Sequence, residues 1–372
     1  MKDENTASDQ AYMRIAEKID KGFQTAPKVD GDISKAFLAF LKIVYSPQEA
    51  ELVQHLDMYI PKTAEELATL FGKDAEAIKE TLAPLTRRAA LVGSKDKYRL
   101  PVVPSLLNLH MFYPDIKPDD LEAAKLYQQF FIKEKFYKYY ATSGKGTPVL
   151  RAVPVEKAID AETKTLDSEE AHAYIKGLDT EDLALVPCPC RTRTEKLDIR
   201  ECKDKYPVGA CIFIGRTAAH FQDIGLGKKV TKEPAIEYLD QMVDLGLIPT
   251  TDNYIDDPHM IMCLCCGCCC SNVRGRTLWD NPTAVLPSSF LPRASDDCIA
   301  CGECVDHCML DALSLDDEEG RPIVDPEKCI GFGVCAIACP EEALRLHRHE
   351  RTPPFQTAMD LYGTVAKDND RA

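Results

Sequence analysis

Cys298-Ile-Ala-Cys301-Gly-Glu-Cys304-Val-Asp-His-Cys308, followed by Cys329-Ile-Gly-Phe332-Gly-Val-Cys335-Ala-Ile-Ala-Cys339-Pro340, is the stretch that decides the fold of the C-terminal part of this chain. The second run begins 31 residues after the first, and short apolar segments follow the two runs at 312–315 and 343–346. Three thiolates at this spacing can wrap one iron–sulfur cubane, and the fourth cysteine of each run then ligates the cluster of the other run. This rule predicts one complete 4Fe–4S site, formed by Cys298, Cys301, Cys304 and Cys339.

The second site of this pattern is short of one ligand. Its cysteines are Cys308, Cys329 and Cys335, and Phe332 stands where the remaining cysteine is expected. A phenyl ring offers no donor atom, so we expect a 3Fe–4S cluster here, or a cubane that takes its last ligand from elsewhere in the chain.

Residues 289–348 resemble the bacterial-type two-cluster ferredoxins, with a hairpin signal at Asp317-Glu-Glu-Gly320 between the two halves. The resemblance implies a pseudo-twofold fold with two short hairpins and two helices. Met309 departs from the family pattern, which has proline after the fourth cysteine. A zinc module is the alternative, but four-cysteine zinc sites favour two separated pairs of cysteines.

Four further cysteines are spread over the middle of the chain, at Cys188, Cys190, Cys202 and Cys211. We expect residues 183–187 to form a buried strand that leads into Cys188, and residues 212–221 to be helical. Thiolates with this irregular spacing can close on one metal centre. An iron–sulfur cluster, a zinc ion and no metal at all remain as alternatives.

The segment 263–270 is the most cysteine-dense part of the chain. Neighbouring side chains diverge, so its six cysteines cannot all face one cubane, and we expect at least three of them to bind a second centre: Cys263, Cys265, Cys266, Cys268, Cys269 and Cys270. The element Cys265-Cys266-Gly267 resembles one in heterodisulfide reductase-like proteins. Residues 183–348 as a whole resemble a group of poorly characterised iron–sulfur proteins of anaerobes, and this resemblance names no substrate.

Two pairs of arginines accompany these cysteines, namely Arg191 with Arg193 and Arg274 with Arg276. We consider three roles for them. They could balance the charge of an anionic cluster, bind an anionic substrate or cofactor at an open iron, or simply lie exposed to solvent.

The N-terminal part of the chain is predicted to be helical. Residues 1–32 are polar and are expected to form a loosely docked lead. Residues 33–104 resemble a winged helix domain, with helix starts at Ser46, Thr63 and Asp74 and a small hairpin at 91–100. Pro84 is expected to interrupt the third helix. This helix has no basic face, so contacts with protein are favoured over contacts with DNA.

Residues 105–182 are expected to form a helical connecting region, in which an aromatic-rich helix spans 118–140. Its aromatic side chains are expected to be core. The predicted class is α+β, and three more segments complete the organisation: a cysteine-rich middle domain at 183–288, the ferredoxin-like domain at 289–348 and a polar tail at 349–372.

Composition limits the function. The chain has 372 residues, 17 cysteines and a formal net charge of −15. The acidity disfavours nucleic acid and suits docking on a positively charged redox partner. We find no signal peptide and no apolar run of about 18 residues, so we expect no membrane insertion. Abundant free thiols indicate a reducing cytoplasm and suggest an anaerobe.

Together these features predict a cytoplasmic electron-transfer protein. In this interpretation the ferredoxin domain exchanges electrons with a partner oxidoreductase, and one or two further 4Fe–4S clusters lie in the middle domain. The first alternative is an iron–sulfur reductase whose central cluster has an open iron that acts on a substrate. The second is a redox-sensing regulator that uses the winged helix.

Overall fold

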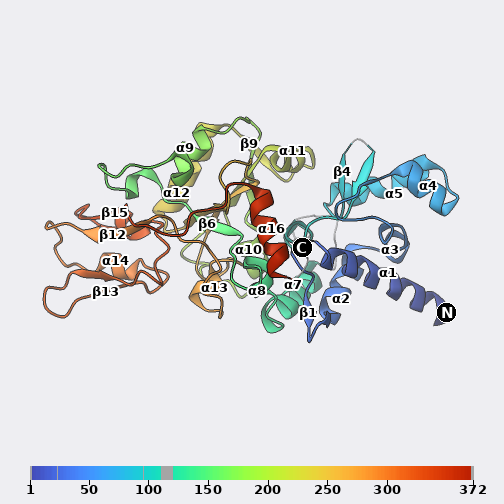
Figure 1. Cartoon of the computed structure of the whole chain (residues 1–372), viewed down its shortest axis with the longest axis horizontal. Helices are drawn as coiled ribbons and strands as arrows, with labels where there is room; N and C mark the ends of the chain where they lie inside the picture. Colours follow the sequence, from blue (N-terminus) through green and yellow to red (C-terminus); the bar gives the residue numbers. More distant parts are fainter. Residues whose placement is uncertain (1, 23, 95, 110–119, 370–372) are drawn as a thin grey trace. The chain divides into compact units, whose positions relative to one another are not determined.

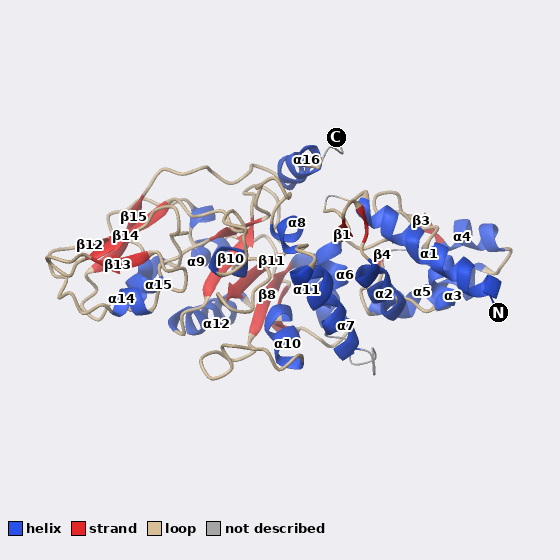
Figure 2. Cartoon of the chain, turned by 90° about the horizontal axis from the view of Figure 1, so that it is seen from below, coloured by secondary structure: helices blue, strands red, loops and turns tan. Residues whose placement is uncertain are grey.

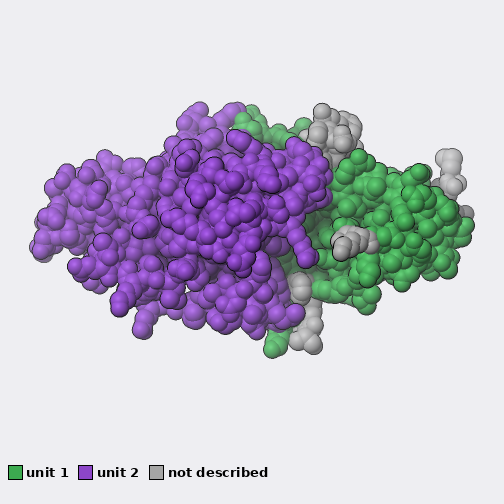
Figure 3. All heavy atoms as spheres, turned by 90° about the horizontal axis from the view of Figure 1, so that it is seen from above, with its two compact units in different colours: residues 1–140, 192–199, 365–372 green, residues 141–191, 200–364 purple. Residues whose placement is uncertain are grey.

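The structure, a computed structural model, describes residues 2–22, 24–94, 96–109 and 120–369. The chain divides into two compact units (Figure 3). Unit 1 comprises residues 1–140, 192–199 and 365–372, and unit 2 comprises residues 141–191 and 200–364. None of the helices in the described ranges has both the length and the apolar character needed to cross a membrane.

The first half of unit 1 is a set of short helices whose starts follow the sequence signals (Figure 1). Ser46 and Glu49 form a reciprocal capping box, as do Thr63 and Glu66, and Asp74 caps the next helix. A sheet in the order β3-β5-β4 accompanies the helices. These elements are α2 (Lys35–Val44), α3 (Pro47–Val53), β3 (Lys62–Thr63), α4 (Ala64–Phe71), α5 (Ala75–Arg87), β4 (Val92–Ser94) and β5 (Lys97–Arg99).

Two expectations for this region are wrong. Residues 1–32 are not merely a polar lead, because helix α1 (Lys2–Asp20) buries Tyr12, Ile15 and Ile19, and a small pair of strands follows it, β1 (Lys28–Val29) and β2 (Asp32–Ile33). Helix α5 also continues past Pro84 to Arg87. A single proline therefore does not end this helix, whose apolar face is buried through Leu85.

The aromatic segment is a broken helix. The structure has α6 (Val103–Leu109), α7 (Asp120–Gln128), a π-helical turn over Gln129–Lys133 and α8 (Tyr137–Ala141), and positions 118 and 119 lie outside the described residues. The break coincides with Lys135, whose φ of 60° no helix can continue. As expected, most of the aromatics are core, although Tyr139 is exposed. The Phe130 ring meets those of Phe37 and Phe40 edge-on, with ring centres 5.8 and 5.7 Å apart.

Unit 2 is built on a six-stranded sheet in the order β6-β10-β11-β8-β7-β9, in which every neighbouring pair is antiparallel. The strands are β6 (Leu150–Ala152), β7 (Leu183–Pro187), β8 (Ala210–Ile214), β9 (Lys228–Val230), β10 (Ile248–Asp252) and β11 (Ile261–Cys265). Strand β7 is the one predicted at 183–187. The region 105–182 is not wholly helical, because it supplies β6, and residues 212–214 are strand where a helix was expected.

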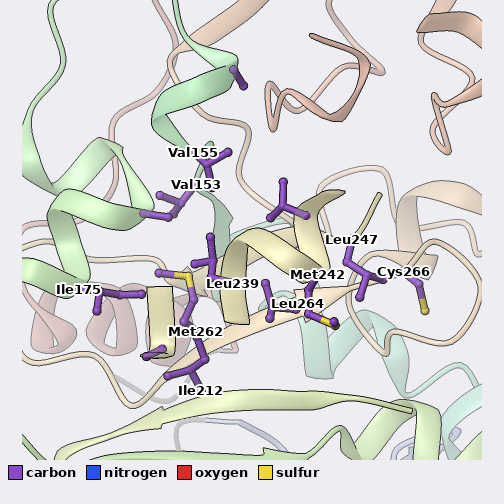
Figure 4. Close-up of a cluster of buried hydrophobic side chains, with 14 of the residues drawn as sticks. Val153, Val155, Ile175, Ile212, Leu239, Met242, Leu247, Met262, Leu264 and Cys266 are labelled. Carbon is purple, nitrogen blue, oxygen red and sulfur yellow. The ribbon is translucent and has the colours of Figure 1, made fainter. Parts of the chain in front are cut away.

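One face of this sheet carries the main apolar core of unit 2. Ile212, Met262 and Leu264 pack there with Leu239 and Met242 of helix α12 (Lys232–Asp244) (Figure 4). Side chains alternate between the two faces of a strand, so the cysteines next to these residues in sequence point to the opposite face. The other helices of this region are α9 (Ala171–Lys176), α10 (Pro189–Lys196) and α11 (Gly215–Asp223).

The C-terminal part has two antiparallel strand pairs and two short helices. One pair is a local hairpin, whereas the other joins strands from the two ends of this part, where the ferredoxin resemblance implied a second hairpin. Strand β12 (Phe290–Ala294) pairs with β15 (Leu344–Arg348), and β13 (Leu313–Leu315) pairs with β14 (Pro322–Val324). Helices α14 (Glu303–Asp306) and α15 (Val334–Ile337) follow the two cysteine loops, and Figure 2 shows them beside the strands. A short helix α13 (Arg274–Thr277) precedes this part. The polar tail ends in α16 (Ala358–Asp368), where Leu361 and Val365 are buried.

Candidate metal centres

The structure brings together the four cysteines expected at the first ferredoxin site. Cys298, Cys301 and Cys304 line one cavity together with Cys339, which comes from the second run. Cys301 is exposed and Cys304 is buried, so the cavity lies near the surface of the domain. Four thiols that surround a cavity, with apolar side chains such as Leu344 between them, fit a 4Fe–4S cluster.

The second site assembles with three thiols. Cys308, Cys329 and Cys335 line another cavity, and Phe332 lies in the same wall. The remaining lining residues are apolar or glycine and offer no further side-chain ligand: Pro292, Leu310, Ala312, Leu313, Gly331, Gly333 and Leu346. Burial raises the pKa of the Cys329 and Cys335 thiols. The cavity therefore presents three thiols and no fourth side-chain donor, and the three-iron cluster at this site stays a prediction.

Six of the ten middle cysteines form a closed ring, here called the six-thiol ring. Cys263 and Cys265 point to the same face of β11, and the pairing of Met262 with Ile212 brings Cys211 of β8 next to Cys263. Cys188 follows the end of β7 and Cys190 lies in the first turn of α10. The turn after β11 returns Cys270 to the ring. Neighbouring thiols interact in the order Cys188, Cys211, Cys263, Cys265, Cys270, Cys190 and back to Cys188.

Hydrogen bonds organise this ring. The Cys270 thiol donates to the Cys265 sulfur at 3.1 Å, and the Thr250 hydroxyl lies 3.3 Å from the same sulfur. Backbone N–H groups donate to two of the sulfurs, from Ser271 to Cys190 at 3.4 Å and from Asn272 to Cys270 at 3.4 Å. Such N–H···S bonds stabilise thiolates, and hydrogen bonds to cysteine sulfurs tune the potential of an iron–sulfur cluster.

The thiols of the ring differ in their acidity. Hydrogen bonds from Cys263 and Cys270 lower the pKa of Cys265 to about 6, and those from Cys188 and Cys263 lower the pKa of Cys211. The donors Cys188, Cys263 and Cys270 have raised pKa values for the same reason. Thiolate is the form that binds metal, so Cys211 and Cys265 are the ring members whose lowered pKa values favour metal binding.

The other four middle cysteines form a separate group, here called the four-thiol group. Cys202, Cys266, Cys268 and Cys269 have sulfur atoms that all lie within 4.8 Å of one another. Cys202 therefore does not join Cys188, Cys190 and Cys211, as its place in the sequence had suggested. It lies in the turns that follow α10, and it meets a segment more than sixty residues away because the loop beyond β11 folds back to it.

A buried cation lies between the two thiol groups. Arg191 is completely buried, and its guanidinium interacts with Cys188 and Cys211 of the six-thiol ring and with Cys266 of the four-thiol group. Burial lowers the pKa of Arg191, but the neighbouring thiolate charges outweigh it, so the net pKa is raised. Arg191 also donates to the carbonyls of Val208 at 2.6 Å and Leu264 at 2.8 Å. Its position suits the charge-balancing role.

The other three arginines have partners within the protein. The Arg193 guanidinium lies over the Tyr127 ring, 4.4 Å from its centre. Arg274 pairs with Glu201 at 2.6 Å, next to Cys202. Arg276 donates to backbone carbonyls of residues 282, 285, 327 and 328, and burial lowers its pKa to about 10. These three arginines are therefore not simply exposed to solvent, and each of them fixes a segment of the chain.

Some residues of the site were missed in the sequence. Thr250 and Ser271 contact ring sulfurs, but a threonine in a strand and a serine after a cysteine run are common without any such role. Gly209 has a φ of 56°, and a Cβ there would lie 3.2 Å from Arg191 Nη2. The one available signal was its place two residues before Cys211.

Comparison with known proteins identifies the C-terminal segment. Residues 297–343 match the model of the 4Fe–4S dicluster domain family. This part of the chain is a 4Fe–4S dicluster ferredoxin domain, in agreement with the geometry of its cysteines. The match does not extend to the middle or N-terminal regions, and no solved structure is significantly similar to the chain.

Several curated relatives share a limited segment with this chain. One is the polyferredoxin-like subunit of an aliphatic sulfonate oxidoreductase from Pyrococcus furiosus, 31% identical over 88 residues, which cover 23% of this chain and 51% of the relative. An uncharacterized ferredoxin from Methanocaldococcus jannaschii is 49% identical over 49 residues, covering 13% and 31%. One component of the Na⁺-translocating ferredoxin:NAD⁺ oxidoreductase complex of Acetobacterium woodii is 43% identical over 49 residues, covering 13% and 14%. The chain thus spans about half or less of the length of these relatives.

Proposed function

We propose that this protein is a multi-cluster electron carrier that relays low-potential electrons to or from a partner oxidoreductase. When bound, the iron–sulfur clusters supply one-electron redox chemistry. In this proposal the chain holds them at three places: the four-cysteine ferredoxin site, the three-cysteine site beside Phe332, and the six-thiol ring.

One observation carries the proposal. Cys329 and Phe332 of the second ferredoxin site belong to the same apolar cluster as Cys265 and Cys270 of the six-thiol ring. Met309 of the ferredoxin domain also lies close to Gly267 of the cysteine-rich segment. A Cβ built on Gly267 would lie 3.4 Å from the Met309 Sδ atom. The rate of electron tunnelling falls steeply with distance, so two redox centres that share one apolar core are well placed to exchange electrons.

The ferredoxin domain places its two cluster sites next to each other, in an order along which electrons could pass. A second apolar cluster contains Cys304, with Cys308, Cys335 and Cys339 packed against it, so it joins the exposed four-cysteine site to the three-cysteine site. The proposed electron path then runs from the four-cysteine site through the three-cysteine site to the six-thiol ring. The exposed end at Cys301 is the proposed point at which electrons enter or leave.

The partner is proposed from chemistry and from the relatives. The formal net charge of −15 favours a positively charged docking surface. Two of the relatives are named as part of an oxidoreductase or of an oxidoreductase complex, which supports a partner of that kind. We propose that the helices of unit 1 and the β4–β5 hairpin, arranged like a winged helix, serve protein contacts. A reducing, cytoplasmic setting is consistent with 17 cysteines that are all free.

The carrier is favoured over an enzyme with an open iron for a specific reason. The four arginines considered as anion-binding groups are engaged with backbone carbonyls, with Glu201, with an aromatic ring or with thiols. They therefore hold the protein together around the centres.

The test compares two serine variants of the full chain, purified without oxygen. Cys301→Ser should remove the reduced-cubane EPR signal of the ferredoxin domain. Cys265→Ser should leave that signal unchanged. It should instead lower the iron content and the number of electrons that the protein accepts, because the six-thiol ring would no longer hold its cluster. Ser314→Ala, on an exposed position of β13, serves as the control. If Cys265→Ser changes neither the iron content nor the number of electrons taken up in a reductive titration, the relay does not extend beyond the ferredoxin domain.

A further inference from the structure

The four-thiol group has the dimensions of a site for a single ion. Three of its six sulfur pairs are separated by 3.7 Å (Cys202 and Cys269), 3.6 Å (Cys266 and Cys268) and 3.4 Å (Cys268 and Cys269), and all six lie within 4.8 Å. Four thiolates bound tetrahedrally to one zinc ion at about 2.3 Å lie roughly 3.8 Å from one another. The three separations are close to this value, and the 4.8 Å limit on the other pairs is compatible with it.

The ferredoxin sites provide an internal comparison. A cubane presents a different iron to each thiolate, so its four ligands must surround the whole cluster, as Cys298, Cys301, Cys304 and Cys339 surround their cavity. In the described ranges, the four-thiol group is the one set of three or more possible ligand side chains whose donor atoms all lie within 4.8 Å of one another. Its size differs from that of the cluster sites in the same chain.

We propose that Cys202, Cys266, Cys268 and Cys269 bind one tetrahedral divalent ion of the zinc class, separate from the iron–sulfur clusters. The ion has a structural role. Cys202, Cys266 and Cys269 are buried and Cys268 is half-buried, and four protein thiolates leave no position for water or substrate. The site joins the turn after α10 to the loop after β11, two segments that no strand pairing connects directly.

The surrounding residues are arranged to hold this site. Arg274 pairs with Glu201 at 2.6 Å and so fixes the residue before Cys202. The Thr277 hydroxyl donates to the Gly267 carbonyl at 2.6 Å and fixes the turn that carries the other three cysteines. A Cβ on Gly267 would lie 3.2 Å from Thr277 Cγ2, so the turn packs closely against α13.

Charge balance supports the same assignment. A divalent ion with four thiolates carries two net negative charges, which are costly to bury without a counter-charge. The Arg191 side chain hydrogen-bonds to Cys266 and supplies one positive charge inside the protein. Ion binding releases the thiol protons, so the site also links folding to metal availability.

The experiment uses the full chain, purified without oxygen from cells supplied with zinc and iron. Metal analysis should give one zinc ion per chain in addition to iron. X-ray absorption at the zinc edge should show four sulfur ligands at about 2.3 Å. This measurement needs no variant, so it holds even where a substitution impairs folding. A mononuclear thiolate-bound iron in place of zinc, seen by EPR after oxidation, would support the single-ion site and identify the ion as iron.

Two variants complete the test. Cys268→Ser, at the half-buried ligand, should reduce zinc to background and leave the iron content and the cubane signals unchanged. Cys301→Ser should do the reverse, losing iron and keeping zinc. If the wild type holds neither zinc nor mononuclear iron and Cys268→Ser loses a cluster signal, the four-thiol group is a cluster site and the inference is wrong. The electron-carrier proposal is tested separately by Cys265→Ser and would survive that outcome.

Discussion

Arg191 donates a hydrogen bond to the carbonyl oxygen of Leu264 at 2.8 Å, which holds a fully buried cation against the strand that carries Cys263 and Cys265. The same guanidinium interacts with Cys188 and Cys211 of the six-thiol ring. A positive charge next to a cluster that becomes more negative on reduction favours the reduced form. Arg191 is therefore expected to set the reduction potential of the centre in the ring.

Replacing Arg191 by glutamine removes the charge and keeps part of the hydrogen bonding. We expect the midpoint potential of the ring centre to fall by on the order of 100 mV, because a unit charge a few ångströms away in a partly screened site contributes a few kcal/mol. Arg191→Lys keeps the charge and should shift the potential less. EPR-monitored redox titration measures both. An unchanged potential in Arg191→Gln, at unchanged iron content, would contradict this role.

Phe332 is predicted to control the number of irons at the second ferredoxin site. Because its ring lies in the wall of the cavity with Cys308, Cys329 and Cys335, a cysteine at this position would supply the missing ligand. Phe332→Cys should therefore add one iron per chain and convert a signal seen in the oxidised protein into one seen in the reduced protein. Phe332→Leu, which offers no ligand, should leave the iron content unchanged. If the unmodified protein already holds four irons at this site, another ligand completes it and the expectation fails.

The ferredoxin domain could be predicted from sequence because its information is local. At the first site three of the four cysteines lie within one loop, and at the second site two of the three do. The 31-residue repeat indicates which cysteine of the other run joins each site. The helix starts at Ser46 and Thr63 were predictable for the same reason, since a capping box involves residues three positions apart.

The partition of the middle cysteines could not be predicted, because it depends on sheet pairing. Cys211 joins Cys263 only because β8 pairs with β11, and Cys202 meets Cys269 only because two loops converge. The helix expected from residue 212 is strand through residue 214, because a short apolar run fits a buried strand and a buried helix equally well. Helix α1 was missed because its large buried side chains, Tyr12, Ile15 and Ile19, lie among polar residues and alanines.

Two buried side chains of unit 2, Asp252 and His259, should make stability depend on pH in opposite directions. Burial raises the pKa of Asp252 to about 6 and lowers the pKa of His259 to about 4. Between pH 5 and 6.5 folded Asp252 holds more protons than unfolded Asp252, so its contribution falls as the pH rises. Over the same range unfolded His259 holds more protons than folded His259, so its contribution rises with pH.

The two effects partly cancel in the wild type and should separate in single variants. Asp252→Asn should leave a protein whose melting temperature rises from pH 5 to 6.5, and His259→Gln one whose melting temperature falls. Thermal unfolding followed by circular dichroism under anaerobic conditions measures both slopes. Equal slopes in the two variants would show that these groups do not titrate as their burial indicates.

The two halves of the ferredoxin domain differ at one pair of equivalent glycines, and this difference gives the last prediction. Gly302 and Gly333 each precede a helix with a φ of 82° and 87°. A Cβ at either position costs about 1–2 kcal/mol for the left-handed backbone. At Gly302 the added atom meets only Leu315, at 3.6 Å, whereas at Gly333 it would overlap Ala158. Arg345 reinforces this contact by donating to the carbonyl of residue 157 at 2.9 Å.

Gly302→Ala should therefore lower the free energy of unfolding only by the cost of holding a non-glycine residue in the left-handed conformation. Gly333→Ala should add an overpacking penalty of about 1–3 kcal/mol or more, because Ala158 lies in a packed core and cannot move away freely. The difference between the melting temperatures of the two variants measures how much the packing of the second half of the domain against residues 156–158 contributes to stability. Since the three-cysteine site borders Gly333, this variant should also lose iron from that site before the four-cysteine site. Equal melting temperatures would mean that the domain is not anchored through Gly333, and that its docking rests on the β12–β15 strand pair and on the contacts of Arg276.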